Sequence, residues 1–202
     1  MTINTDFNRR VGSKHKAMRR YIILILTLIA VAAYGQDKYN YVHFNKLTEV
    51  KGTDYVIASI ENWSKMADSK GKYLLFINTK TGQSNQVDFP SDGYIESIEQ
   101  IKLDTLGINK IIVFARTVDL NNKNGVDWVD PKQIIILSTD GKERIQLTDS
   151  KLYVGTWIVN RQSGTVVVTG HYDSNNNNKH DKGDKNEISI YDLKTFKLIY
   201  KI

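Results

Sequence analysis

The feature that most constrains the fold is an internal repeat in the second half of the chain. When residues 119–136 are placed on residues 173–190, an offset of 54 positions, acidic and apolar residues recur in register. The matched pairs are Asp119/Asp173, Asn121/Asn175, Asn122/Asn176, Asn124/Asn178, Asp127/Asp181, Asp130/Asp184, Ile134/Ile188 and Ile136/Ile190. A polar loop that recurs together with its flanking apolar residues indicates one supersecondary unit used more than once, as in solenoids and propellers.

From Tyr39 onward the chain predicts strands and no helices. Short runs of β-branched and aromatic residues alternate with Asn, Asp, Gly and Lys, without apolar residues at helical spacing. The expected strands are 41–46, 55–60, 73–78, 84–89, 95–103, 110–117, 133–138, 144–148, 152–159, 165–172, 187–192 and 198–202. They fall into units of about 39–90, 93–148 and 151–202. We therefore expect an all-β fold, a propeller-like array of about three four-stranded antiparallel sheets.

The N-terminal region has the pattern of a secretory signal peptide. Basic residues lead into a 13-residue apolar stretch, 21–33, and the small residues Ala33 and Gly35 precede Gln36. A helix of this length spans only about 20 Å, less than the ~30 Å hydrocarbon layer, so we favour cleavage over a retained anchor. We expect a signal peptide over 1–35, with Met18 as a second candidate start. The all-β domain, 36–202, is then secreted or periplasmic and meets the membrane only through the signal peptide.

The positive charge of the chain lies mainly in this N-terminal segment. The full sequence carries 28 Lys and Arg against 22 Asp and Glu, a net charge of +6. Residues 1–35 hold six of the basic residues and one acid, which leaves 22 basic and 21 acidic residues in the body. A nearly neutral body does not predict a nucleic-acid partner. The absence of cysteine excludes disulfides and thiolate metal sites.

The two repeated loops have the side-chain spacing of a twelve-residue calcium loop. Counting Asp119 and Asp173 as place one, oxygen-bearing side chains fall at places one, three, nine and twelve, with a carbonyl expected at place seven. The candidate ligands are Asp173, Asn175, Asn177, Lys179 (through its carbonyl), Asp181 and Asp184, and in the first loop Asp119, Asn121, Asp127 and Asp130. A hard cation wants six to eight such oxygens, so the set predicts structural Ca²⁺ and argues against zinc and copper.

The second loop is expected to be the better site. In the first loop Lys123 stands at place five, where an oxygen is wanted, and Asn177 fills that place in the second. Asn124 and Asn178 occupy place six, where we expect a left-handed backbone. Place twelve is Asp in both loops, and Lys182 and Lys185 weaken the negative potential of the second. These features predict a dissociation constant of about 10⁻⁴ to 10⁻³ M. The alternative is that Asn and Asp serve only as turn formers.

The same segments resemble a known family. A strand, an acidic Asn-rich loop, a strand, the turn Thr-Asp-Gly-Lys over 139–142 and the tail Ile-Gln-Leu-Thr over 145–148 are similar to the blades of TolB-type or WD40-like β-propellers. The resemblance covers 93–202 and, more weakly, 39–90. It implies a binding scaffold, often exported, with the loops between second and third strands on one face. Propellers usually have four to eight blades. Three units therefore imply an open array, a ring completed by two chains, or another sandwich or barrel.

Catalytic patterns are sparse. The chain has no G-x-S-x-G, H-E-x-x-H or phosphate-binding glycine loop, and we assign no catalytic or metal role to His171 or His180. Trp63 and Trp128 lie in connections between second and third strands, where exposed indoles could stack on sugar or peptide. We favour instead that they cover the core.

The expected function is that of an exported, non-catalytic, propeller-like binding or scaffold protein with one or two structural calcium loops. Its partner would be an unidentified protein or carbohydrate ligand, and a homo-oligomer is left open. The alternative is a secreted or periplasmic hydrolase that uses the loop carboxylates.

Overall fold

The structure is a computed structural model that describes residues 44, 46–59, 72–123, 125–177 and 180–202. The chain divides into two units, 1–40 and 41–202, and every described residue belongs to the second. The predicted signal peptide and Trp63 lie outside the described residues. Within the described part of the chain, no helix is long and apolar enough to cross a membrane.

The described residues form three four-stranded antiparallel sheets. The first sheet contains β1 (Lys46–Glu49), β2 (Tyr55–Ser59), β3 (Lys72–Asn78) and β4 (Ser84–Phe89). The second contains β5 (Tyr94–Leu103), β6 (Ile108–Arg116), β7 (Gln133–Leu137) and β8 (Arg144–Gln146), with the 3₁₀ turn η1 (Asp104–Leu106) between β5 and β6. The third contains β9 (Leu152–Asn160), β10 (Thr165–Tyr172), β11 (Lys185–Asp192) and β12 (Leu198–Lys201).

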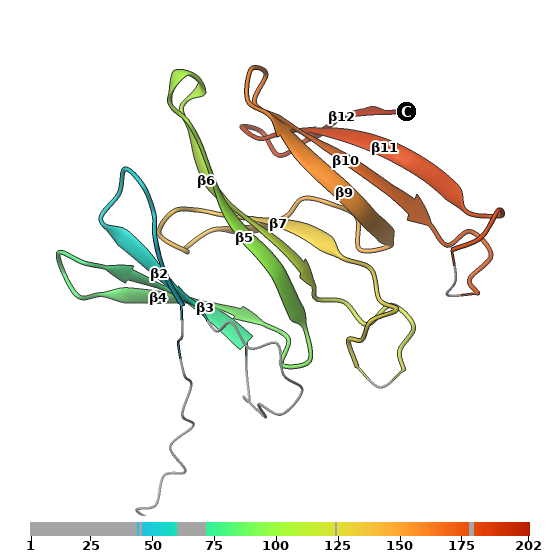
Figure 1. The fold of residues 1–202 in the computed structure, drawn as a ribbon, viewed down its shortest axis with the longest axis horizontal. Coiled ribbons are helices and arrows are strands. Elements are labelled where there is room, and N and C mark those ends of the chain that lie inside the picture. The colour runs from blue at the N-terminus through green and yellow to red at the C-terminus, as the bar shows by residue number, and fades with distance from the viewer. Residues whose placement is uncertain (1–43, 45, 60–71, 124, 178–179) are drawn as a thin grey trace, which may run out of the picture. The chain divides into compact units, whose positions relative to one another are not determined.

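Each sheet is a meander in which consecutive strands are neighbours (Figure 1). The described chain contains no α-helix, so the predicted all-β, propeller-like array of three four-stranded sheets is confirmed. Short turns join the third and fourth strands of each sheet at the predicted places, around Gly82, Gly141 and Phe196. All three residues have positive φ angles of 71°, 74° and 59°, which reverse the chain within a few residues.

The first strand includes residues that the sequence prediction left outside it. Residues 41–46 were expected to form it, and of these 41–43 and 45 lie outside the described residues. The described strand β1 covers Lys46–Glu49 and pairs with β2 from Lys46↔Ser59 to Glu49↔Val56. The reason is the tight turn that follows, in which Gly52 has a φ of 76° and the Val50 N–H donates to the Tyr55 carbonyl at 2.9 Å. A turn this short fixes the pairing register, so the partner of β2 must end close to Val50.

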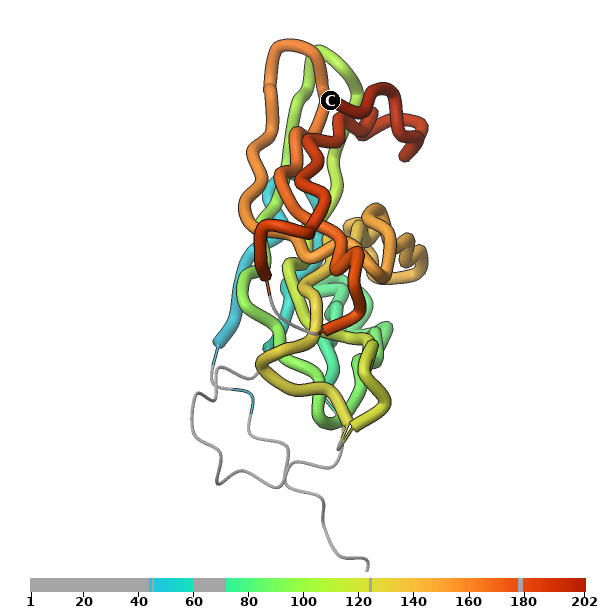
Figure 2. The backbone as a smooth tube through the Cα atoms, turned by 90° about the vertical axis from the view of Figure 1, so that its right-hand side faces the viewer, coloured from blue at the N-terminus to red at the C-terminus, as the bar shows by residue number. Residues whose placement is uncertain are grey.

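The second sheet is buried on both faces. Along β6, Ile111 and Val113 belong to one apolar cluster, which includes Leu74 and Phe76 of the first sheet. Ile112 belongs to a second cluster, shared with residues of the third sheet. Alternate side chains of a strand point to opposite faces, so a continuous apolar run fits a strand covered on both sides. Figure 2 shows the β5–β6 and β9–β10 hairpins side by side.

The 54-residue offset holds for the loops but not for the strand that follows them. Phe114 pairs with Ile134 in the second sheet, whereas Val168, 54 positions later, pairs with Ser189 instead of Ile188. A shift of one residue moves a side chain to the other face of a sheet. Ile134 is therefore fully buried, while 38% of Ile188 is exposed.

The turn between β7 and β8 rests on the first sheet. The Asn85 side chain donates from Nδ2 to the Asp140 carbonyl at 2.9 Å. At Gly141 a β-carbon would lie 2.5 Å from Cδ2 of the buried Phe76, so this position must lack a side chain.

Substituting Gly141 by Ala should therefore destabilise the protein more than the same change at Gly82. Both residues have left-handed φ angles, which costs an alanine about 1–2 kcal/mol, but Gly82 has open space where the β-carbon would lie. The clash with Phe76 should add about 1–3 kcal/mol at Gly141. Urea denaturation of G141A and G82A measures the difference. Equal free energies of unfolding would show that the turn does not pack on Phe76.

Candidate metal centre

The two repeated loops connect equivalent strands. Residues 119–130, the 119–130 loop, lie between β6 and β7, and residues 173–184, the 173–184 loop, lie between β10 and β11. The last residue of each loop, Asp130 or Asp184, is a buried aspartate, 3% and 8% exposed respectively.

Both loops are closed by the same hydrogen bonds to this buried aspartate. Asp130 Oδ1 accepts the Leu120 N–H at 2.9 Å, and its Oδ2 accepts the Asp127 N–H at 2.8 Å. The 173–184 loop repeats both bonds, from Ser174 N–H to Asp184 Oδ1 at 3.2 Å and from Asp181 N–H to Asp184 Oδ2 at 2.9 Å. The register-matched duplication in the sequence therefore corresponds to a duplicated loop conformation.

The side chains at places one and three also converge in both loops. The Asn177 N–H donates to Asp173 Oδ1 and to Asn175 Oδ1, each at 3.1 Å. In the 119–130 loop the Lys123 N–H donates to Asp119 Oδ1 at 3.3 Å and to Asn121 Oδ1 at 2.7 Å. Two side-chain oxygens are thereby brought to the same backbone N–H in each loop.

The 173–184 loop gathers more of its polar side chains than the 119–130 loop does. Asp181 Oδ2 accepts Asn175 Nδ2 at 3.1 Å and Asn177 Nδ2 at 2.7 Å. The Gly183 N–H donates to Asp181 Oδ1 at 2.7 Å, and together with the two amides it lowers the pKa of Asp181. The structure thus brings Asp173, Asn175, Asn177 and Asp181 together, with Asp184 bound to the Asp181 backbone. In the 119–130 loop, place five is Lys123, which donates its backbone N–H to Asn121 Oδ1 and has no side-chain amide to offer. Asp127, the counterpart of Asp181, accepts the Val129 N–H on its Oδ1 at 2.9 Å.

A left-handed residue lies at place four of both loops. Asn122 has a φ of 55° and Asn176 a φ of 57°. This conformation turns the N–H of the next residue back toward places one and three, which explains the shared hydrogen bonds. The sequence prediction put the left-handed residue at place six, but Asn124 and Asn178, as well as the proposed ligand Lys179, lie outside the described residues.

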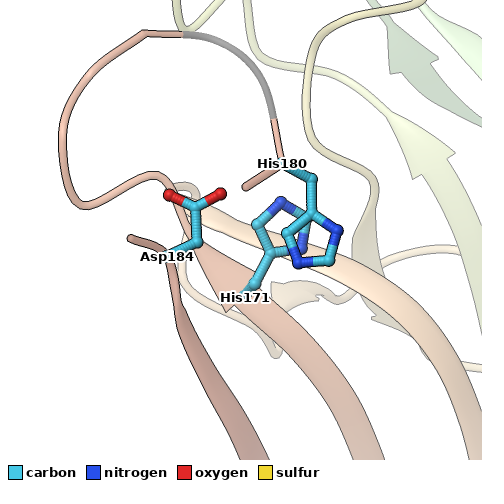
Figure 3. Close-up of side chains that lie close together, drawn as sticks. All are labelled: His171, His180 and Asp184. Atoms are coloured by element: carbon cyan, nitrogen blue, oxygen red, sulfur yellow. The ribbon is translucent and has the colours of Figure 1, made fainter. Parts of the chain in front are cut away.

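The structure adds two histidines that sequence reasoning had set aside. Ligand atoms of His171, His180 and Asp184 all lie within 4.8 Å of one another (Figure 3). The two imidazole rings stack with centroids 4.0 Å apart, and Tyr153 stacks on His171 at 5.0 Å. Burial, and then the charge of His180, lower the pKa of His171, which favours the neutral form of its imidazole. The available sequence signal was that His171 lies two residues before Asp173 and that His180 directly precedes Asp181.

Tyr153 lies near acidic residues of both loops. Burial raises the pKa of its hydroxyl, and the charges of Asp173, Asp130 and Asp184 raise it further. Two of these aspartates belong to the 173–184 loop and one belongs to the 119–130 loop. The buried ends of both loops therefore lie near the same tyrosine.

Trp128 does not cover the core, and the favoured prediction for this residue is wrong. Its side chain is 65% exposed and stands beside Val129, which is 50% exposed. The Tyr94 ring lies 5.4 Å from the indole, and the Arg116 guanidinium lies over it at 5.1 Å. The 119–130 loop places the indole at its surface because Asp127 and Asp130, on either side, are held by the loop's internal hydrogen bonds.

Comparison of the chain with protein-family models, with curated proteins and with solved structures finds no match.

The buried aspartate should stabilise its loop without any ion. Asp130→Ala removes the acceptor for two backbone N–H groups, those of Leu120 and Asp127, and should lower the free energy of unfolding by about 2–4 kcal/mol. Asp149→Ala is the control, because the exposed Asp149 carboxylate accepts one backbone N–H among the described residues, that of Lys151, and its loss should cost less than about 1 kcal/mol. Thermal melts with a chelator present measure both. Equal losses would contradict a structural role of the buried carboxylate.

Proposed function

We propose that this protein is an exported, non-catalytic, propeller-like binding scaffold whose repeated loops hold a structural calcium ion. The observation that carries the proposal is the convergence of Asp173, Asn175, Asn177 and Asp181 within the 173–184 loop. A calcium ion there would tie the end of β10 to the start of β11. The resemblance to TolB-type or WD40-like blades supports the binding role.

The chemistry of the 173–184 loop favours a hard cation. The side-chain NH₂ groups of Asn175 and Asn177 both donate to Asp181 Oδ2. This carboxylate oxygen therefore attracts positive charge, and a bound cation would be stabilised beside it. A half-turn of the Asn177 amide would replace its Nδ2 by an oxygen, the ligand type that calcium requires. Asp184, at place twelve, is shorter than the usual bidentate Glu, and each of its oxygens accepts one backbone N–H and keeps one lone pair for an ion. We therefore propose the modest affinity of an extracellular site, with a dissociation constant of about 10⁻⁴ to 10⁻³ M.

The exposed indole of Trp128 supports a binding surface beside the 119–130 loop. An exposed tryptophan that packs against Tyr94 and carries Arg116 over its ring has a fixed orientation and an accessible edge. Such a surface suits an aromatic, peptide or sugar group of a protein or carbohydrate ligand. By holding the neighbouring loops, the ion would rigidify this surface.

Calcium should raise the melting temperature of the full-length chain. With about 2 mM calcium and the affinity above, binding adds roughly 0.6–1.8 kcal/mol relative to a chelator. Asp173→Asn should remove most of this shift, because Asp173 stands at place one of the better loop. Asp119→Asn, the matched change in the 119–130 loop, should remove less. The measurement is a thermal melt in calcium and in chelator.

Two outcomes would contradict the proposal. An unchanged melting temperature in calcium would leave the loops as turn formers. Loss of a hydrolytic activity in Asp173→Asn, without any change in calcium-dependent stability, would favour the hydrolase instead.

A further inference from the structure

We infer that His171, His180 and Asp184 form a second metal site, specific for a borderline divalent transition metal such as Zn²⁺. The site does not depend on the calcium proposal. One imidazole comes from the end of β10, the other from the 173–184 loop, and the carboxylate from the residue just before β11 (Figure 3).

The three ligand atoms lie near the spacing that one ion requires. Nitrogen and oxygen ligands bind zinc at about 2.0–2.2 Å, so two of them are at most about 4.4 Å apart. The ligand atoms here are all within 4.8 Å of one another, so a movement of a few tenths of an ångström brings them into reach. The stacked rings must turn for their nitrogens to point at a shared ion. His180 is exposed, so it can rotate with little loss of packing.

The other two ligands are held in place by neighbouring groups. Tyr153 is paired with His171 across the sheet and stacks on its ring at an interplanar angle of 15°. The backbone N–H groups of Ser174 and Asp181 hold the two oxygens of Asp184. Groups of this kind orient metal ligands and raise the affinity of a site. Tyr153 is therefore a positioning residue for the proposed site.

The fold of the loop does not require the histidines. At the positions 54 residues earlier stand Thr117 and Val126, yet the 119–130 loop closes with the same hydrogen bonds to its buried aspartate. A second copy of the loop thus shows that closure needs no imidazole at these places. The histidine pair gives the third sheet a chemistry that the second sheet lacks.

The ligand types separate this site from the calcium loop. Two imidazole nitrogens with one carboxylate suit zinc, copper, nickel or iron, whereas calcium takes oxygen ligands. Three protein ligands also leave one position of a tetrahedral ion open to water. Asp184 is the only residue common to the two proposed ligand sets.

The test is a calorimetric titration of the full-length chain with zinc chloride. We expect one zinc ion per chain, and cobalt in its place should give a visible absorption band of bound Co²⁺. His180→Gln and His171→Gln should each weaken binding by at least about tenfold. Asp88→Asn is the control, because this exposed carboxylate lies on β4 of the first sheet and is not one of the three proposed ligands, and it should leave the affinity unchanged.

Paired variants distinguish this site from the calcium loop. Asp173→Asn should lose the calcium-dependent melting shift and keep zinc binding, and His180→Gln should do the reverse. Because His180 is exposed, its substitution should leave the melting temperature in chelator unchanged. Absence of zinc binding, or binding that survives both histidine substitutions, would overturn the inference. Loss of zinc binding in Asp88→Asn would overturn it equally.

Discussion

The burial of the second sheet on both faces is the constraint on which the rest of the structure depends. Its two central strands supply apolar side chains alternately to the two core clusters, through Ile111 and Val113 on one side and Ile112 on the other. Each outer sheet contributes to one cluster only. The sequence repeat is therefore not a folding unit, because a sheet taken from the array loses the partner that covers its apolar face.

The two repeated loops share their closing hydrogen bonds and differ in the polar side chains that they carry. Each ends in a buried aspartate that accepts two N–H groups of its own loop, so both copies are closed by the same hydrogen bonds. What differs is the set of side chains along the loop. Lys123 replaces the amide of Asn177, and neither histidine has a counterpart 54 residues earlier. Both loops are closed by hydrogen bonds to the buried aspartate. Among the described residues, the 173–184 loop of the third sheet gathers more polar side chains than the 119–130 loop does.

The sequence predicted the strands well wherever turns and apolar alternation agreed. It missed residues 47–49 of β1, since the short turn at Gly52 fixes the pairing register more strongly than the apolar residues before it. The 54-residue offset also matched Ile188 to the buried Ile134. An offset measured between the loops cannot reveal that the pairing of β10 with β11 is shifted by one residue relative to that of β6 with β7. At the candidate site, hydrogen bonds join Asp173, Asn175, Asn177 and Asp181, four of the residues that the loop spacing singled out, and their role as metal ligands stays a prediction. The pairing of His171 with His180 depends on how the loop returns to β10, which no local pattern specifies.

The internal bonds of Asp130 and Asp184 bear on the order of events during maturation. Since these carboxylates are satisfied by backbone N–H groups, each loop reaches its shape from the chain alone. An ion that arrives later would meet a loop that is already closed, and would need only the asparagine amides to turn, so little ordering entropy would be lost on binding. Metal would then act as a late rigidifier and not as a nucleus for folding, so a chain that emerges into an ion-poor environment would still acquire its native topology.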